Sequence, residues 1–228
     1  MLIAFEGPDG AGKSTLIKQL YATLVQEREL FKPQYRWAHE VGHSMAMVRE
    51  PYDSHLGTYL KVVTTERDLS PLAYTLAFTA ARRELYDDLA ADEAVADVNG
   101  PDSLVLSDRS YLSTIVYQGM VAQQLSAKEA VDAYLPLHQL AKLPHPNAFL
   151  VLFSQAPLGT MDTAHGMNLM QGKRHAYIQA YREASKELAA RGLVQHVAYL
   201  CTDFPGVSAC GWALDQIGRV FEAKHPPR

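Results

Sequence analysis

The stretch FEGPDGAGKS at residues 5–14 constrains the fold of this chain more than any other part of the sequence. It follows an apolar run and places Gly7, Gly12, Lys13 and Ser14 at the spacing GxxxxGK[ST]. Glycines let the backbone bend so that successive N–H groups point at one anion, and a helix that starts there adds the positive end of its dipole. The pattern predicts a loop that holds a nucleoside triphosphate, with Lys13 reaching the β- and γ-phosphates and Ser14 binding Mg²⁺.

The rest of the chain alternates short apolar runs with helical patterns. Strands are predicted at 2–6, 45–49, 103–108, 148–153 and 196–200. Helices are predicted at 12–29, 70–94, 110–123, from 126 onward, 173–191 and 205–223. Apolar strands separated by helices imply a parallel sheet covered on both faces. The expected fold class is α/β, a three-layer P-loop NTPase fold with about five parallel strands, in a single domain over residues 1–228.

Charge and composition limit the classes of partner. The net charge is −4 and the longest basic runs are pairs, so long nucleic acid is not favoured and small anionic ligands are. Cys201 and Cys210 are nine residues apart, which is neither a metal-ligand spacing nor a disulfide framework. No apolar run reaches the roughly 18 residues of a membrane span, and no signal peptide pattern is present. We therefore expect a cytoplasmic protein with reduced thiols and no membrane partner.

Asp108 ends the apolar strand SLVLSD. An acidic residue at the carboxyl end of a parallel strand beside the P-loop strand is placed to contact the water molecules bound to Mg²⁺. The alternative is that Asp108 caps the helix that follows, and the two roles are compatible.

Three further clusters lie after strands or on a helix between them. Arg49 stands at the end of a strand because Pro51 cannot continue the ladder. Phe78 and Arg82, in LAFTAARREL, are four residues apart and share a helix face. Each has a purely structural alternative: a solvated strand end, a core aromatic, or an arginine that lies along its own helix. The third cluster, SDRSYLSTIVYQG, contributes Arg109, Thr114, Tyr117 and Gln118. Its structural alternative is that Tyr117 and Gln118 only cap and pack their helix.

Together, the motifs GPDGAGKS, VREP, LAFTAAR and SDRSYLSTIVYQG resemble those of the thymidylate kinase family in order and spacing. The likeness runs from residue 2 to about 119 and is weaker at AFLVLF and AYREASKELA. It implies transfer of a phosphoryl group from ATP, with Mg²⁺, to a pyrimidine deoxynucleoside monophosphate, most simply from dTMP to dTDP in the supply of dTTP. It also suggests a homodimer packed through helices.

The resemblance implies a role for each site residue. Arg49 and Arg109 would clamp the acceptor phosphate, Tyr117 would press on the sugar to favour deoxyribose, and Asp9 would face that sugar. The base would be contacted by Phe78, Arg82, Thr114 and Gln118. ATP would contact the loop residues Gly7, Asp9, Gly10, Ala11, Gly12, Lys13, Ser14 and Thr15. The transfer itself would depend on Asp9, Lys13, Arg49, Arg109 and Arg174.

The sequence departs from the family pattern in four places. Tyr52-Asp53-Ser54 replaces Gly-Gly-Thr after the Arg-Glu-Pro motif, Ala81 replaces an aspartate, and residues 30–44 carry no motif. Residues 154–172 form either a surface loop or a lid, and Asp162 stands there where an arginine is expected. A missing cation can cost about 10³–10⁵ in rate.

The departure at the lid keeps several interpretations open. Lys173 or Arg174 fills the cationic role, a cation comes from elsewhere, or the enzyme is slow. The acceptor is alternatively a modified deoxyuridine nucleotide, a nucleoside or a pyrimidine within DNA, and a third interpretation is a nucleotide-binding module without turnover.

Overall fold

The five predicted strands form one sheet. The computed structural model describes residues 1–29, 37, 44–51, 54–66, 69–91, 103–154, 173–203 and 207–225. Its strands are β1 (Leu2–Glu6), β2 (Ser44–Arg49), β3 (Ser103–Asp108), β4 (Ala148–Phe153) and β5 (His196–Cys201). They pair in the order β2-β3-β1-β4-β5, and every pair is parallel. The predicted parallel sheet is therefore confirmed, with the P-loop strand at its centre.

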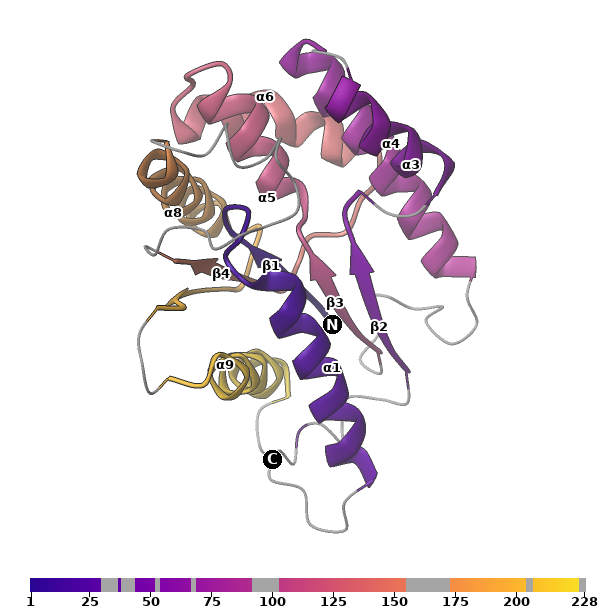
Figure 1. Ribbon diagram of the computed structural model, residues 1–228, viewed down its shortest axis with the longest axis vertical. Helices are drawn as coiled ribbons and strands as arrows, with labels where there is room; N and C mark the ends of the chain where they lie inside the picture. The colour runs from indigo at the N-terminus through magenta and orange to yellow at the C-terminus, as the bar shows by residue number, and fades with distance from the viewer. Residues whose placement is uncertain are drawn as a thin grey trace.

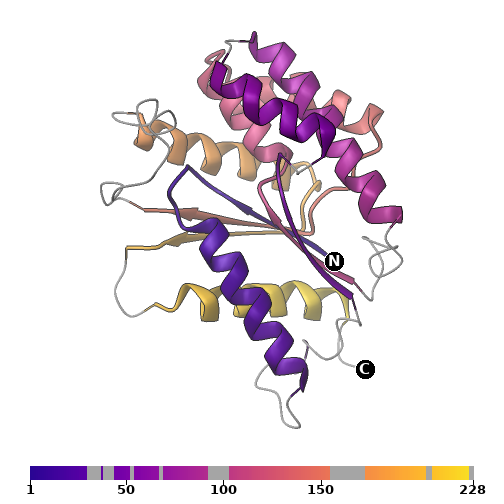
Figure 2. The ribbon, with the colours of Figure 1, turned by 45° about the vertical axis from the view of Figure 1, so that its right-hand side comes forward.

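Helices cover both faces of this sheet, as predicted (Figures 1 and 2). One face carries α1 (Lys13–Glu29) and α9 (Ala209–Lys224). The other face carries α4 (Pro71–Ala91), α5 (Tyr111–Thr114), the π-helix η1 (Ile115–Val121), α6 (Ala127–Leu140) and α8 (Arg174–Ala190). A further helix, α3 (His55–Glu66), packs against α4. None of the described helices has both the length and the hydropathy that a membrane span requires.

Strand β1 is buried on both faces, which fixes the start of the P-loop. Ile3 and Phe5 pack in the core under α1 and α9, and Ala4 packs on the opposite side beneath α5 and α8. The apolar face of α1 is buried at Leu16, Ile17, Leu20 and Leu24. Val25 of the same helix is 37% exposed.

The structure adds two features that the sequence patterns did not predict. Helix α3 lies where no helix was expected; Ser54 accepts a hydrogen bond from the Gly57 N–H at its start, and Leu60 and Val63 are buried. The helix predicted over 110–123 divides into α5 and the π-helix η1. Residues 155–172, with Asp162, and most of 30–44 lie outside the described residues.

The order of the strands places the functional motifs at one edge. The sheet order reverses at β1, and ligands of open α/β sheets bind outside the carboxyl ends of the strands at such a point. The register pairs Asp108 of β3 with both Phe5 and Arg49. The P-loop, the Arg49 turn and the Asp108-Arg109 turn therefore leave the sheet side by side.

Candidate active site

The P-loop connects β1 to α1 and depends on glycine at its first position. Gly7 has φ +129°, a conformation that L side chains rarely adopt. A Cβ built on Gly7 would lie 1.9 Å from the backbone oxygen of Leu152 in β4. The loop can pass this close to the neighbouring strand only without a side chain there.

Lys13 is folded into the loop that it follows. Its Nζ donates to the backbone oxygens of Gly7 and Pro8, each at 2.9 Å. Burial, together with the nearby charge of Arg109, lowers the pKa of Lys13 to about 7. An anion in the loop would favour the charged ammonium, so the site is electrostatically prepared for phosphate.

Ser14 and Asp108 meet at the carboxyl edge of the sheet. The Ser14 hydroxyl donates to Oδ2 of Asp108, whose side chain is buried. A hydroxyl and a carboxylate are the oxygen ligands that Mg²⁺ uses beside phosphates, so the pair fits the ion. The alternative role of Asp108 as a helix cap is wrong, because Ser110 caps α5 by accepting from the Leu112 N–H.

Arg109 faces the P-loop from the end of β3. Its Nη2 forms an ion pair with Asp9, and Nη1 donates to Ser113 Oγ at 3.0 Å and to the Tyr181 hydroxyl at 3.1 Å. Its guanidinium lies 5.4 Å from the centre of the Tyr117 ring, and the Tyr117 hydroxyl donates to Asp9 at 3.3 Å. Burial alone would raise the pKa of Asp9, but the charges of Arg109 and Lys13 bring it below the usual value.

Glu6 is a site residue that the sequence analysis missed. It ends β1 and is fully buried, and its carboxylate accepts from Ser110 Oγ at 2.5 Å and from Ser113 Oγ at 2.6 Å. Burial raises the pKa of Glu6 to about 7, although the two hydrogen bonds and Arg109 lower it. The available signal was a single acidic residue that ends an apolar strand directly before the first P-loop glycine.

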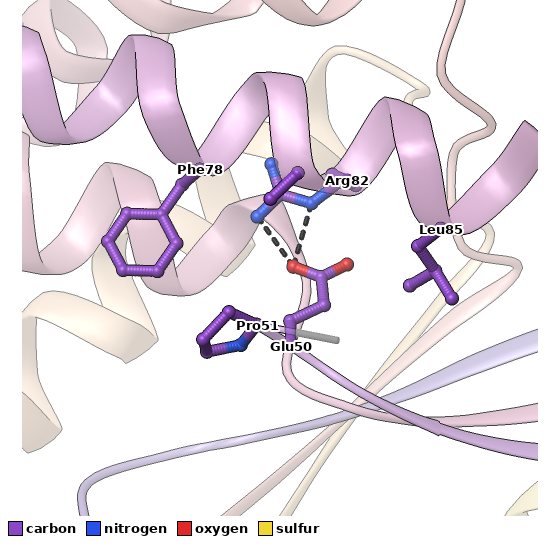
Figure 3. A pocket seen from close by; sticks show the side chains of 6 residues that line it. Glu50, Pro51, Phe78, Arg82 and Leu85 are labelled. Atoms are coloured by element: carbon purple, nitrogen blue, oxygen red, sulfur yellow. Dashed lines mark hydrogen bonds and ion pairs between the residues drawn. The ribbon is translucent and has the colours of Figure 1, made fainter. Parts of the chain in front are cut away.

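A small pocket lies between α4 and the turn after β2 (Figure 3). Phe78 and Arg82 of α4 line it together with Glu50 and Pro51, which a cis peptide bond joins. The guanidinium of Arg82 contacts Glu50 Oε2, from Nε at 2.7 Å and from Nη2 at 2.6 Å, and Nη2 also donates to Thr114 at 3.2 Å. The structure thus brings Phe78 and Arg82 together in one pocket, and a hydrogen bond joins Arg82 to Thr114.

The remaining predicted residues lie on β2, η1 and α8. Arg49 is exposed at the end of β2, beside Asp108 in the register. Gln118 is half-buried in η1, and Arg174 is the first residue of α8. Of the residues that depart from the family pattern, Tyr52, Asp53 and Asp162 lie outside the described residues.

Comparisons with known proteins agree with this arrangement. The family model for thymidylate kinase matches residues 5–156. The thymidylate kinase of Chlorobium luteolum is 35% identical over 121 residues, which cover 52% of this chain and 48% of that protein. The thymidylate kinase of Chlamydia trachomatis serovar L2 is 28% identical over 196 residues, covering 84% of this chain and 86% of that one. This chain spans about half the length of the first of these relatives.

Solved structures of low sequence identity share the fold. The crystal structure of thymidylate kinase from Ehrlichia chaffeensis matches with a TM-score of 0.59 at 17% identity, over 97% of this chain and 98% of that one. Thymidylate kinase from Candida albicans matches with a TM-score of 0.58 at 18% identity, over 98% and 90% of the two chains. The three-layer P-loop fold is thereby confirmed independently of the sequence motifs.

Proposed function

Because this chain belongs to the thymidylate kinase family, we propose that it transfers the γ-phosphoryl group of ATP to dTMP and forms dTDP. The observation that carries the proposal is the ion pair between Asp9 of the P-loop and Arg109 at the neighbouring strand end. This pair places a guanidinium at the rim of the phosphate loop. An anionic acceptor bound there would lie next to the far end of a triphosphate held by the loop.

The P-loop is the proposed donor site. Lys13 would give up its hydrogen bonds to the two loop carbonyls and bind the β- and γ-phosphates of ATP instead. The phosphate charge would also keep the ammonium group charged. Ser14 and Asp108 would hold Mg²⁺, which when bound neutralises phosphate charge. The protein has little covalent work to do in such a transfer, because positioning and charge neutralisation supply most of the rate.

The acceptor site is proposed on the β2 and β3 side of the loop. Arg109 and Arg49, at the ends of adjacent strands, would bind the monophosphate from two directions. The base would stack on Phe78, with Arg82, Thr114 and Gln118 as hydrogen-bonding partners, and Asp9 and Tyr117 would contact the sugar. The acceptor phosphate is already anionic, so the transfer needs no general base.

The start of α8 is the proposed source of the cation that the family pattern expects from the lid. Lys173 is exposed immediately before the helix, and Arg174 is its first residue. Both follow directly on residues 154–172, the proposed lid. Either side chain would approach the triphosphate from the start of α8 and stabilise the charge of the transition state.

We also propose that the protein forms a homodimer through α3 and α4, at the outer edge of the molecule (Figure 1). Large apolar side chains are exposed on these two helices at Leu56, Tyr59, Val62, Leu72 and Leu76. Exposed apolar side chains of this kind are stabilised when a second copy covers them. Light scattering should report a dimer, and Tyr59→Glu should shift it towards the monomer; a monomeric wild-type chain would contradict this assembly.

A coupled ADP-release assay tests the proposed reaction. The purified chain is supplied with ATP and Mg²⁺ and, in separate reactions, with dTMP, dUMP, dCMP, thymidine or single-stranded DNA. We expect the highest kcat/KM with dTMP. ADP release with another acceptor alone would overturn the assignment of dTMP. ATP binding without release of ADP in any reaction would make the protein a nucleotide-binding module.

A further inference from the structure

We propose that Glu6 is a positioning residue that orients Arg109 towards the acceptor site through the hydroxyl of Ser113. This inference rests on the proposed function, in which Arg109 binds the acceptor phosphate. Glu6 itself lies behind Arg109, fully buried at the end of β1. Both of its hydrogen-bond partners in the described part of the chain are serine hydroxyls rather than cations.

Ser113 joins Glu6 to Arg109 directly. Its Oγ lies 2.6 Å from Glu6 Oε2, 3.0 Å from Arg109 Nη1 and 2.8 Å from the hydroxyl of Tyr181. A serine hydroxyl has one proton and two lone pairs. When that proton points at an ionised Glu6, the lone pairs of Ser113 face the guanidinium and the tyrosine hydroxyl.

The charge of Glu6 therefore sets the direction of the whole chain of hydrogen bonds. With Glu6 ionised, Ser113 donates to Glu6, Tyr181 donates to Ser113, and the lone pairs of both hydroxyls accept from Arg109 Nη1. With Glu6 protonated on Oε2, the oxygen that faces Ser113, the carboxyl group itself donates to Ser113. The Ser113 proton must then turn towards Arg109 or Tyr181, where it opposes the donors of Arg109.

The backbone of Arg109 is held as firmly as its side chain. Arg109 has φ +80°, a left-handed conformation that is strained for a residue with a side chain and persists only where the surroundings enforce it. Its N–H donates to the Phe5 oxygen at 3.0 Å, and its own oxygen accepts from Ser107 Oγ at 2.7 Å. Glu6 adds a third restraint, because it also accepts from Ser110, the cap of α5.

The surroundings of Glu6 place its titration in the neutral range. Burial raises its pKa to about 7, and Glu50 adds to this, while Arg109 and the two serine hydroxyls lower it. The other charged or titratable groups that act on it are Lys13 of α1, Arg82 of α4, Tyr111 of α5 and Tyr181 of α8. The orientation that Arg109 requires should therefore become populated as the pH rises through about 7.

The test compares wild type with Glu6→Gln, Ser113→Ala and Ser113→Thr in the full chain. The matched control is Ser185→Ala. This substitution removes a fully buried hydroxyl of α8, which donates to the backbone oxygen of Tyr181 and is hydrogen-bonded to the hydroxyl of Tyr199. Steady-state kinetics give KM for dTMP and for ATP, and melting curves report folding. Glu6→Gln and Ser113→Ala should each raise KM for dTMP by about tenfold or more and leave KM for ATP within about twofold.

Three further results distinguish positioning from a general structural role. The Glu6→Gln/Ser113→Ala double variant should be no worse than either single variant, because both remove the same link. Ser113→Thr, which keeps the hydroxyl, should restore the affinity for dTMP. The rise of kcat/KM for dTMP with pH around 7 should become smaller in Glu6→Gln, in which Lys13 is the remaining site group with a pKa of about 7. Equal losses for dTMP and ATP, additive losses, or an unchanged pH profile would overturn the inference.

A measurement without ligand separates this inference from the proposed function. The Arg109 Nε–H resonance of the free protein should shift with an apparent pKa near 7 in wild type and shift less in Glu6→Gln, where Lys13 is the remaining group near Arg109 with a pKa of about 7. If wild type does not phosphorylate dTMP but this resonance titrates, the proposed function fails and the positioning role stands. If wild type is active and the resonance does not respond to Glu6→Gln, the positioning role fails and the function stands.

Discussion

Replacing Arg82 with methionine should destabilise this protein by several kilocalories per mole, because it leaves Glu50 buried without a counter-charge. Only 4% of the Arg82 side chain and 6% of the Glu50 side chain are exposed. Both contacts of the pair use Glu50 Oε2, and Oε1 is buried with no hydrogen-bond partner among the described residues (Figure 3). Without Arg82, Oε2 loses its charged donor and the carboxylate stays buried without a cation.

The magnitude follows from this burial. Removing one member of a buried ion pair costs about 3–5 kcal/mol, whereas replacing both members by apolar residues of similar volume is often neutral or stabilising. Arg82→Met and Glu50→Met should each cost about 3–5 kcal/mol, and the double variant about 2 kcal/mol or less. The coupling energy of the cycle should therefore exceed about 3 kcal/mol.

The same helix supplies a matched control for this cycle. Arg83 of α4 forms an ion pair with Asp87, but the two side chains are 35% and 63% exposed. Arg83→Met should cost no more than about 1 kcal/mol. The comparison separates the effect of burial from the effect of removing an arginine at this part of α4.

Urea unfolding at pH 7.5, followed by circular dichroism and by tryptophan fluorescence, measures each free energy of unfolding. Single-variant costs below about 1 kcal/mol, or costs that simply add in the double variant, would refute the reasoning. The double variant also tests the acceptor pocket. If Arg82 reads the base as proposed, this variant should fold and yet bind dTMP more weakly than wild type.

Three further outcomes follow from the site. Lys13→Ala should abolish ADP release while the melting temperature stays within a few degrees, because the buried ammonium serves phosphate and not the core. Gly7→Ala should weaken ATP binding at least about tenfold by calorimetry, since its Cβ would meet the Leu152 oxygen at 1.9 Å. Burial lowers the pKa of His138 from 6.5 to about 3, so the unfolded chain takes up the proton first. The stability contributed by neutral His138 is present above pH 6.5 and is lost as pH falls towards about 3. Urea unfolding between those two pH values should accordingly show a smaller loss for His138→Leu than for wild type.

The features that could be predicted from the sequence are those with a local cause. The glycine spacing of the P-loop and the apolar runs of the five strands depend on neighbouring residues alone, and the structure places them as expected. Helix α3 was missed because its sequence, HLGTYLKVVTTE, includes β-branched residues of weak helix propensity. Its stability comes from burying Leu60 and Val63 beside α4, which is a tertiary effect.

The partners of the site residues could not be predicted in the same way. Glu50 and Arg82 are 32 residues apart, and Glu6 and Ser113 are 107 apart. Such pairs depend on the order and register of the strands, which no local pattern specifies. The sequence does predict which turns carry Arg49 and Arg109, because the carboxyl ends of parallel strands share one edge.

Arg82 and Arg109 differ in how their charge is balanced, and this difference supports their separate roles. Arg82 is paired directly with the carboxylate of Glu50 at 2.6 Å, so it offers hydrogen-bond donors with little net charge. Such a group suits an uncharged base. Arg109 is held from behind by the neutral hydroxyls of Ser113 and Tyr181, and its carboxylate partner, Asp9, is 51% exposed at the front. Because a phosphate can displace an exposed carboxylate far more easily than a buried one, the charge of Arg109 remains available to the acceptor.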